Sequence, residues 1–388
     1  MTVTTPKGFR AAGIAAGLKS DSKLDLAIVI NDGPSQGAAV VFTSNKVTAN
    51  PIRWSKRALR DSGGKARAIV LNSGGANCYT GAYGFQTSVE TAQETAALLN
   101  TSPDEVQVCS TGLIGYGGEE FREAILSSLP RLVSAASTTG GEAAAKAIMT
   151  TDTRPKTSSY KSPDGWSIGG MAKGAGMLAP GLATMLVVIT TDADLSSADA
   201  QQVLAEATDA TFNRLDSDGC MSTNDQVTLM VSGAAGVAPT GDEFSEALYA
   251  VCLDRALHLQ DDAEGATHSI AIEVVGAESV DDALEVGRSI ARNNLFKAAV
   301  FGNDPNWGRI LAAVGTTDAA LDADNVDVTI NGVRVCTKGG PDRPVEEVDM
   351  TPKQVDVTVN LFAGSQEATV WTNDLTHGYV TENSAYSS

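Results

Sequence analysis

One segment near the middle of the chain constrains the fold and the chemistry more than any other. Residues 173–183 are rich in Gly and Ala, and Thr184 stands between them and the apolar run 185–189. Glycines let a loop bend sharply, and a short apolar run bounded by polar residues is typical of a buried strand. The segment therefore predicts a pliable loop that delivers one threonine to the head of a buried strand.

The Ala183–Thr184 junction has the residue types that self-cleavage requires. A hydroxyl that attacks the carbonyl just before it needs a bendable backbone and a small preceding side chain. Cleavage would leave the Thr184 hydroxyl beside its own α-amine, a group with an ordinary pKa of about 7.7 to 8.0. Thr184 is thus a candidate nucleophile with a built-in base. A glycine-rich loop that enters a strand, with Thr184 present for its β propensity, explains the same pattern without chemistry.

Composition excludes several classes of partner. The formal net charge is −19, which disfavours both nucleic acid and anionic membrane surfaces. The five cysteines form no CxxC pair, so a disulfide framework and a zinc site are both unsupported. No signal peptide and no apolar run of membrane-spanning length is present, and we expect a cytoplasmic protein without a metal ion.

Hydrophobic periodicity predicts a mixed α/β chain. Apolar runs bounded by turn formers favour strands, and apolar residues at helical spacing favour helices between them. The predicted strands are 27–30, 38–43, 68–71 and 226–232, and the predicted helices are 87–99, one that Ser196 caps, and 243–260. The final third has predicted strands at 270–275, 326–330, 355–361 and 368–371, which indicates a smaller α+β unit, and composition puts its boundary near Gly276.

Other segments carry polar residues in patterns that suit a site. Residues 109–115 place Ser110 and Thr111 before Gly112, and a turn of this kind can direct backbone N–H groups at an oxyanion, although an ordinary strand-to-helix turn explains it as well. Carboxylates crowd the end of the last predicted helix at 261–264, where the helix dipole disfavours them. Polar runs at 215–225 and 301–310 are explained equally well as structural loops, and the aspartates of 215–225 lack the spacing of a calcium loop.

In combination, these segments resemble the ornithine acetyltransferase family of arginine biosynthesis, also called glutamate N-acetyltransferase. The resemblance covers nearly the whole chain. Its blocks are Asn72-Ser73-Gly74, 110–115, 147–153, 173–186, Ser222-Thr223-Asn224-Asp225, 263–267, 304–309 and the tail 383–388.

The resemblance implies a layered αββα sandwich with a smaller α+β C-terminal domain at 277–388. It implies self-cleavage before Thr184 into an α chain, 1–183, and a β chain, 184–388, which assemble as α2β2. Thr184 would be the nucleophile, and the Thr111 hydroxyl and Gly112 N–H would form the oxyanion hole. The residues that would contact substrate are Thr150, Lys173, Thr184, Glu264, Asn383 and Ser388.

The implied reaction is ping-pong transfer of an acetyl group from N2-acetyl-L-ornithine to L-glutamate through acetyl-Thr184, without a cofactor. Whether acetyl-CoA also serves as a donor is left open by the sequence. A self-processed amidase or aminopeptidase, in which water discharges the acyl-threonine, is the alternative enzyme. An uncut amino-acid-binding or regulatory protein is the alternative without catalysis.

Overall fold

The computed structural model describes residues 2–19, 22–179 and 185–385. The chain forms two compact units that differ in size. The first contains Met1–Ala175, Gly181–Asn213 and Met221–Leu259, and the second contains Gly176–Pro180, Arg214–Cys220 and Gln260–Ser388. Two short segments of the second unit therefore interrupt the sequence of the first.

The first unit is built on two sheets. One has the strand order β1-β2-β4-β5 and the other β3-β9-β8-β7-β6; only the pairs β4–β5 and β8–β9 are parallel. The strands are β1 Phe9–Ile14, β2 Leu26–Asn31, β3 Gly37–Phe42, β4 Ala68–Ser73, β5 Val106–Thr111, β6 Lys156–Lys161, β7 Ser167–Lys173, β8 Leu186–Thr191 and β9 Gln226–Val231.

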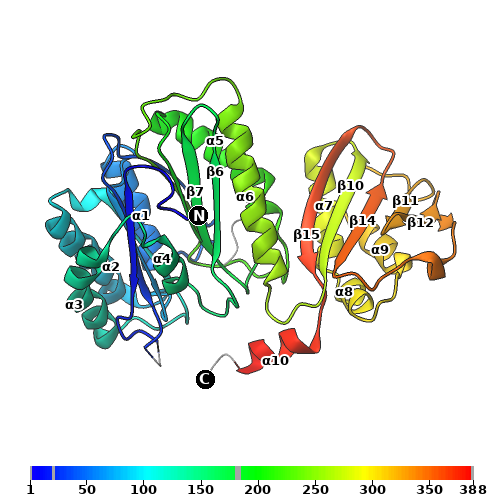
Figure 1. Cartoon of the computed structure of the whole chain (residues 1–388). Coiled ribbons are helices and arrows are strands. Elements are labelled where there is room, and N and C mark those ends of the chain that lie inside the picture. The colour runs from blue at the N-terminus through cyan, green and yellow to red at the C-terminus, as the bar shows by residue number, and fades with distance from the viewer. Residues whose placement is uncertain (1, 20–21, 180–184, 386–388) are drawn as a thin grey trace. The chain divides into compact units, whose positions relative to one another are not determined.

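Helices cover the outer face of each sheet, as Figure 1 shows. The outer helices are α1 Asn50–Asp61, α2 Gly81–Leu99, α3 Glu119–Ala135, α5 Ser197–Ala210 and α6 Glu243–Asp261, with short 3₁₀ turns at Pro103–Glu105 and Phe212–Arg214. Helix α4 Gly141–Ala147 instead contributes Ala144, Ala145 and Ala147 to the core between the sheets. One core lies between the sheets, where Leu71 and Val188 belong to the same cluster, and another lies under α1 to α3, around Trp54 and Phe121. The layers are helix, sheet, sheet and helix, which confirms the predicted αββα sandwich.

The predicted strands of this unit coincide with β2, β3, β4 and β9 to within two residues at each end. Ser196 caps α5 by accepting the Asp199 N–H at 3.1 Å, as its pattern predicts. Helix α2, however, begins at Gly81 and not at 87. Its first turn contains Gly84, where a Cβ would lie 1.9 Å from Thr80 Oγ1, so side chains just before the helix demand a glycine that hides the helical pattern.

The second unit is one six-stranded sheet with helices α7, α8 and α9. The strand order is β13-β12-β11-β14-β10-β15. Its elements are β10 Ser269–Ala277, α7 Val280–Ala291, α8 Asn294–Phe301, α9 Trp307–Val314, β11 Asp327–Ile330, β12 Val333–Thr337, β13 Gly340–Pro341, a 3₁₀ turn at Val345–Glu347, β14 Gln354–Asn360, β15 Gln366–Asn373 and α10 His377–Ala385.

Strand β10, which the sequence predicts at 270–275, lies next to the edge strand β15 and pairs with both β14 and β15. It ends at Ala277, so it precedes nearly all of the segment 277–388 that the sequence predicts as the smaller domain. The strands predicted at 326–330, 355–361 and 368–371 correspond to β11, β14 and β15. A single core on the helical face of the sheet includes Ile272, Val286 and Val357.

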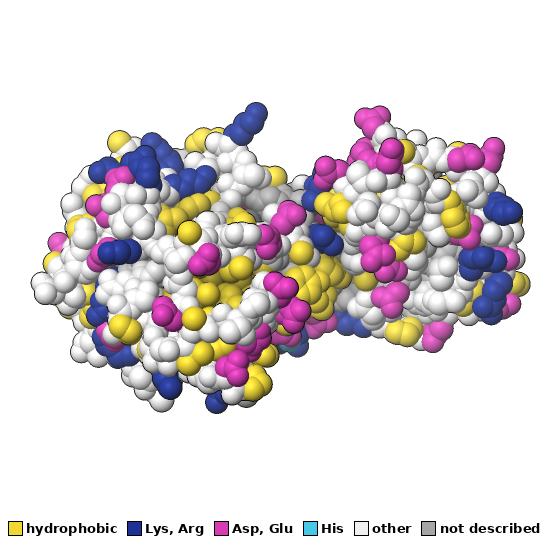
Figure 2. Space-filling model, turned by 90° about the horizontal axis from the view of Figure 1, so that it is seen from above, with side chains coloured by type: hydrophobic (Ala, Val, Ile, Leu, Met, Phe, Trp, Pro, Cys, Tyr) yellow, Lys and Arg dark blue, Asp and Glu magenta, His cyan; other side chains and the backbone are white. Residues whose placement is uncertain are grey.

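Charged side chains of both signs are interspersed on each unit, as the face in Figure 2 shows. Among the described helices, none combines the length and the apolar character that a membrane crossing requires.

Candidate active site

Thr111 and Gly112 lie at the carboxyl end of β5 in the first unit. Thr111 is 1% exposed, and Gly112 has a φ of +132°. A Cβ at position 112 would lie 2.6 Å from the backbone nitrogen of Gly75, so the site requires glycine. Within the described residues, the Gly112 N–H donates to no acceptor. A backbone donor is therefore available one residue from a buried hydroxyl.

Lys173 ends β7 and meets Thr111 from the other sheet. Its side chain is buried, and Nζ donates to Thr111 Oγ1 at 3.2 Å, across 62 positions of sequence. A hydroxyl can accept two hydrogen bonds and donate one. Because the Lys173 ammonium donates to this hydroxyl, the O–H hydrogen of Thr111 remains free to point at a different acceptor. The structure thus brings together two of the residues that the sequence predicts for the site.

Asp152 organises the backbone around Thr150 and Lys173. Its Oδ2 accepts the Thr150 N–H at 3.0 Å, and its Oδ1 accepts the Gly174 N–H at 2.8 Å and the Lys156 ammonium at 2.5 Å. Burial raises the pKa of Asp152, but the charges of Lys173 and Lys156 and the Gly174 N–H outweigh it and hold this pKa below its ordinary value. Asp152 therefore stays ionised and fixes two predicted substrate-contact positions.

Three predicted site residues, Ala183, Thr184 and Ser388, lie outside the described residues. The described chain resumes at Met185, and Leu186 begins β8, which lies between β7 and β9. The apolar run after Thr184 is thus a buried strand, as the sequence predicts.

Glu264 and Asn383 lie together in the second unit. Asn383, on α10, donates its Nδ2–H to Glu264 Oε2 at 3.0 Å. Gly265 follows Glu264 with a φ of +63°, and a Cβ there would lie 2.2 Å from the Tyr379 backbone nitrogen. Glycine at 265 therefore allows α10 to pack against the loop that carries Glu264. The Gly176 backbone approaches the same carboxylate, since a Cβ at 176 would lie 2.5 Å from Glu264 Oε2.

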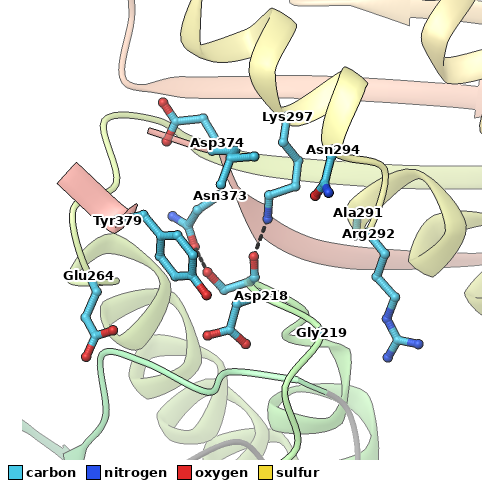
Figure 3. Close-up of a pocket in the computed structure, with 12 residues that line it drawn as sticks. Asp218, Gly219, Glu264, Ala291, Arg292, Asn294, Lys297, Asn373, Asp374 and Tyr379 are labelled. Atoms are coloured by element: carbon cyan, nitrogen blue, oxygen red, sulfur yellow. Dashed lines mark hydrogen bonds between the residues drawn. The ribbon is translucent and has the colours of Figure 1, made fainter. Parts of the chain in front are cut away.

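A pocket of about 340 Å³ in the second unit is lined by Glu264 and by residues from α7, α8, β15 and α10. Figure 3 shows the carboxylates of Asp218 and Glu264 and the cationic groups of Lys297 and Arg292 at this pocket. Carboxylates favour an ammonium group, and Lys and Arg favour a carboxylate. The lining therefore suits a small zwitterion such as an amino acid.

Burial changes the protonation of several pocket residues. It lowers the pKa of Lys297 to about 8, against the opposing charges of Asp218 and Asp216. It raises the pKa of Tyr379 to about 12, with Asp218 acting in the same direction. It also raises the pKa of Asp218, although the N–H groups of Cys220 and Met177 partly stabilise the carboxylate. Near neutral pH, Lys297 is therefore cationic and Tyr379 is a neutral hydrogen-bond donor.

The sequence prediction missed Asp152 and Lys297. Asp152 lay inside the block 147–153, where its spacing gave no sign that it would accept two backbone N–H groups. Lys297 occupies a buried position of α8, where a lysine is unusual, and this break in the apolar pattern was its signal. Asp218 was singled out within the polar run 215–225, with no role assigned.

Metal ligands are not gathered anywhere in the described ranges: no three His, Cys, Asp or Glu side chains there form a group that could hold an ion. All five cysteines are free thiols in the structure.

The chain is an αββα protein whose candidate active site is the strand-end cluster of Thr111, Gly112 and Lys173. A family model described as the ArgJ family matches residues 10–388. The chain therefore belongs to the ArgJ family, and the family predicted from the sequence motifs is confirmed.

Relatives match over their full length. The chain is 57% identical over 387 residues to the arginine biosynthesis bifunctional protein ArgJ of Thermobifida fusca, and 55% identical over 388 residues to the protein of that name from Streptomyces coelicolor, with 100% of both chains covered in each case. A solved ornithine acetyltransferase from Mycobacterium tuberculosis, complexed with ornithine, is 48% identical with a TM-score of 0.44, over 46% of this chain and 94% of that one. The ArgJ structure from Bacillus halodurans is 34% identical with a TM-score of 0.49, over 52% of this chain and 98% of that one.

Proposed function

We propose that this chain is an acyltransferase of arginine biosynthesis that moves the acetyl group of N2-acetyl-L-ornithine to L-glutamate, giving L-ornithine and N-acetyl-L-glutamate. Membership of the ArgJ family and the likeness to an ornithine acetyltransferase support the activity. The observation that carries the mechanism is the hydrogen bond from Lys173 to Thr111 beside Gly112. It leaves the Thr111 hydroxyl and the Gly112 N–H as two donors, which we assign to the oxyanion hole.

In the first half-reaction, Thr184 Oγ attacks the acetyl carbonyl of acetylornithine. The carbonyl oxygen becomes an oxyanion that accepts hydrogen bonds from the Thr111 hydroxyl and the Gly112 N–H. The C–N bond then breaks, the ornithine α-amine takes the proton that the threonine hydroxyl gave up, and an acetyl ester remains on Thr184.

The second half-reaction reverses these steps with a different amine. The α-amine of glutamate attacks the ester carbonyl, and the same donors hold the second oxyanion. Thr184 Oγ leaves and recovers a proton, which completes N-acetylglutamate. We assign the proton transfers to the α-amine of Thr184, since its ordinary pKa of about 7.7 to 8.0 suits a base near neutral pH.

Substrate contacts are assigned to Thr150, Lys173, Glu264, Asn383 and Ser388. Lys173 is a buried cation that would bind the α-carboxylate common to both amino acids. Glu264, to which Asn383 donates, would bind an amino group of ornithine. The zwitterionic lining of the adjoining pocket supports amino acids as the substrate class.

The free α-amine of Thr184 requires cleavage after Ala183, so we propose that the mature protein consists of chains 1–183 and 184–388 in an α2β2 assembly. The reaction would take place in the cytoplasm, without a cofactor. Acetyl-CoA as a second acetyl donor is consistent with the word "bifunctional" in the names of the relatives.

The test is Thr184→Ala, with Thr184→Ser as the matched control that keeps a hydroxyl. The alanine variant should remain one full-length band on a denaturing gel and should transfer no acetyl group. The serine variant should be cut and should keep part of the activity. A full-length alanine variant with normal transfer would refute the nucleophile. Free acetate in place of N-acetylglutamate would identify the amidase alternative.

A further inference from the structure

Two neighbouring side chains in the loop before β9 bind the backbone next to the two groups of the proposed reaction. One binds the residue before Thr111, and the other binds the residue after Thr184. Asn224 and Asp225 are 4% and 0% exposed, and both belong to the first unit. They follow one another in sequence, yet their side chains bind different strands. Neither has a role in the mechanism above.

Asn224 binds the strand end that carries Thr111. Its Nδ2 donates to the carbonyl of Ser110 at 2.9 Å and to the carbonyl of Ala76 at 2.7 Å. Its Oδ1 accepts the Thr223 hydroxyl at 2.6 Å, which fixes the orientation of the amide. Because Ser110 is joined directly to Thr111, Asn224 holds the oxyanion donors through one peptide unit.

Asp225 binds the strand that follows Thr184. Its Oδ1 accepts the Met185 N–H at 3.0 Å. Met185 follows Thr184 directly in the sequence, so Asp225 binds the peptide group next to the proposed nucleophile.

The loop does not depend on these two side chains for its own shape. The Thr43 N–H donates to the Asp225 carbonyl at 3.0 Å, and the Ala49 N–H donates to the Thr223 carbonyl at 3.0 Å. The Thr43 hydroxyl donates to the Ser222 carbonyl at 2.8 Å. These bonds anchor the backbone, so the side chains of Asn224 and Asp225 are free to serve the strands on either side.

We propose that Asn224 and Asp225 form a positioning pair that sets the distance between the oxyanion donors and the acyl-accepting threonine. The proposal rests on the proposed function, because that function supplies the two groups to be aligned. Errors of about 1 Å in such an alignment can reduce a rate by about 10²-fold. Neither residue touches the substrate; each acts through the peptide next to a reacting residue.

The buried environment of Asp225 makes the comparison of two substitutions at this position informative. Burial raises the pKa of Asp225 well above its ordinary value, and the Met185 N–H, the Ser222 hydroxyl and the charge of Lys173 oppose this only in part. Asparagine keeps a side-chain oxygen in the place of Oδ1, so it can still accept the Met185 N–H. Asp225→Asn should therefore keep the alignment, whereas Asp225→Ala should lose it.

Asn31 provides a matched control at the opposite end of β9. It is buried, and its Nδ2 donates to the carbonyl of Val231 at 2.9 Å, so it also links one sheet of the first unit to the other. Asn31→Ala removes a bond of the same kind far along the strand from Asp225. Its effect measures what the loss of such a bond does to stability alone.

The experiment compares Asn224→Ala, Asp225→Ala, Asp225→Asn and Asn31→Ala in the full-length protein, with self-cleavage, kcat and KM per cleaved molecule, and Tm as readouts. We expect kcat to fall by about 10²-fold in the two alanine variants of the pair, with KM within about threefold. Asp225→Asn should keep kcat within about fivefold and the pH profile of the wild type. Asn31→Ala should lower Tm while kcat stays unchanged.

Three results would overturn the pair. The first is a kcat of the wild type in Asn224→Ala or Asp225→Ala. The second is an equal loss of kcat in Asn31→Ala, which would indicate a merely structural role. If Asp225→Ala does not fold, a kcat of Asp225→Asn that falls by about 10²-fold would contradict the pair, because asparagine keeps the oxygen that accepts the Met185 N–H. These results leave the proposed function intact, since that fails with an active Thr184→Ala or with free acetate as the product.

Discussion

Replacing Thr111 by valine isolates the contribution of one hydroxyl. Valine keeps a β-branched side chain of nearly the same shape and suits the end of a strand, so β5 should retain its pairing with β4. Thr111 is 1% exposed and accepts a hydrogen bond from Lys173 at 3.2 Å. Its own O–H is therefore directed at a different acceptor, and the mechanism makes that acceptor the oxyanion.

The expected loss follows from this geometry. Removal of one oxyanion-hole donor lowers kcat by about 10² to 10³, which corresponds to about 2.7 to 4 kcal/mol of transition-state stabilisation. The Gly112 N–H remains, so activity should not vanish. KM for both substrates should change little, since the ground-state carbonyl binds the hole less strongly than the oxyanion does.

Steady-state kinetics with acetylornithine and glutamate, together with single-turnover acetylation of Thr184, measure the effect. Thr111→Ser is the control, because it keeps the hydroxyl and loses only a methyl group; its kcat should stay within about tenfold of the wild type. If Thr111→Val changes KM and leaves kcat intact, the hydroxyl binds substrate and the oxyanion assignment fails.

Three further predictions concern the surroundings of the site. Asp152→Asn should lower the unfolding free energy by about 3 to 5 kcal/mol at pH 7. The pKa of Asp152 in the folded state lies below the ordinary 3.8, so the difference from the wild type in urea unfolding should shrink as the pH falls below 3.8. Gly265→Ala should raise KM for acetylornithine at least tenfold by displacing α10 at Tyr379, whereas Gly236→Ala, with a similar φ but open space, should leave KM unchanged. Lys297 has a pKa of about 8 in the folded state against an ordinary 10.5, so the folded state binds fewer protons than the unfolded state between these pH values. The unfolding free energy of the wild type relative to Lys297→Met should therefore rise from about pH 8 to about pH 10. A difference that does not change with pH would contradict the lowered pKa.

Sequence reasoning predicted the central architecture because the relevant signals are local. The apolar run after Thr184 and the capping of α5 by Ser196 each depend on a few adjacent residues. The start of α2 was predicted too late, since Gly84 answers to a close contact with Thr80 that propensity does not contain. Helix propensity and the packing at the helix start disagree there, and the packing prevails.

The candidate site was predicted as a set of separate motifs. Family resemblance named Thr111, Lys173, Glu264 and Asn383, but the spacing of these residues in sequence does not reveal that Lys173 donates to Thr111 or that Asn383 donates to Glu264. Asp152 was missed because its importance lies in the backbone N–H groups that it accepts. Such bonds depend on how distant strands end beside one another, which no single motif encodes.

The strand order of the five-stranded sheet in the first unit bears on how the enzyme is made. From edge to edge the order is β3-β9-β8-β7-β6, and the proposed cut falls between β7 and β8. After the cut, one polypeptide would supply β3, β7 and β6, and the other would supply β8 and β9 from within the sheet. Each product would hold its partner through two complete strand ladders, β3–β9 and β7–β8. The two fragments should consequently behave as one inseparable body, and the sheet must be assembled from the intact precursor before its backbone is broken.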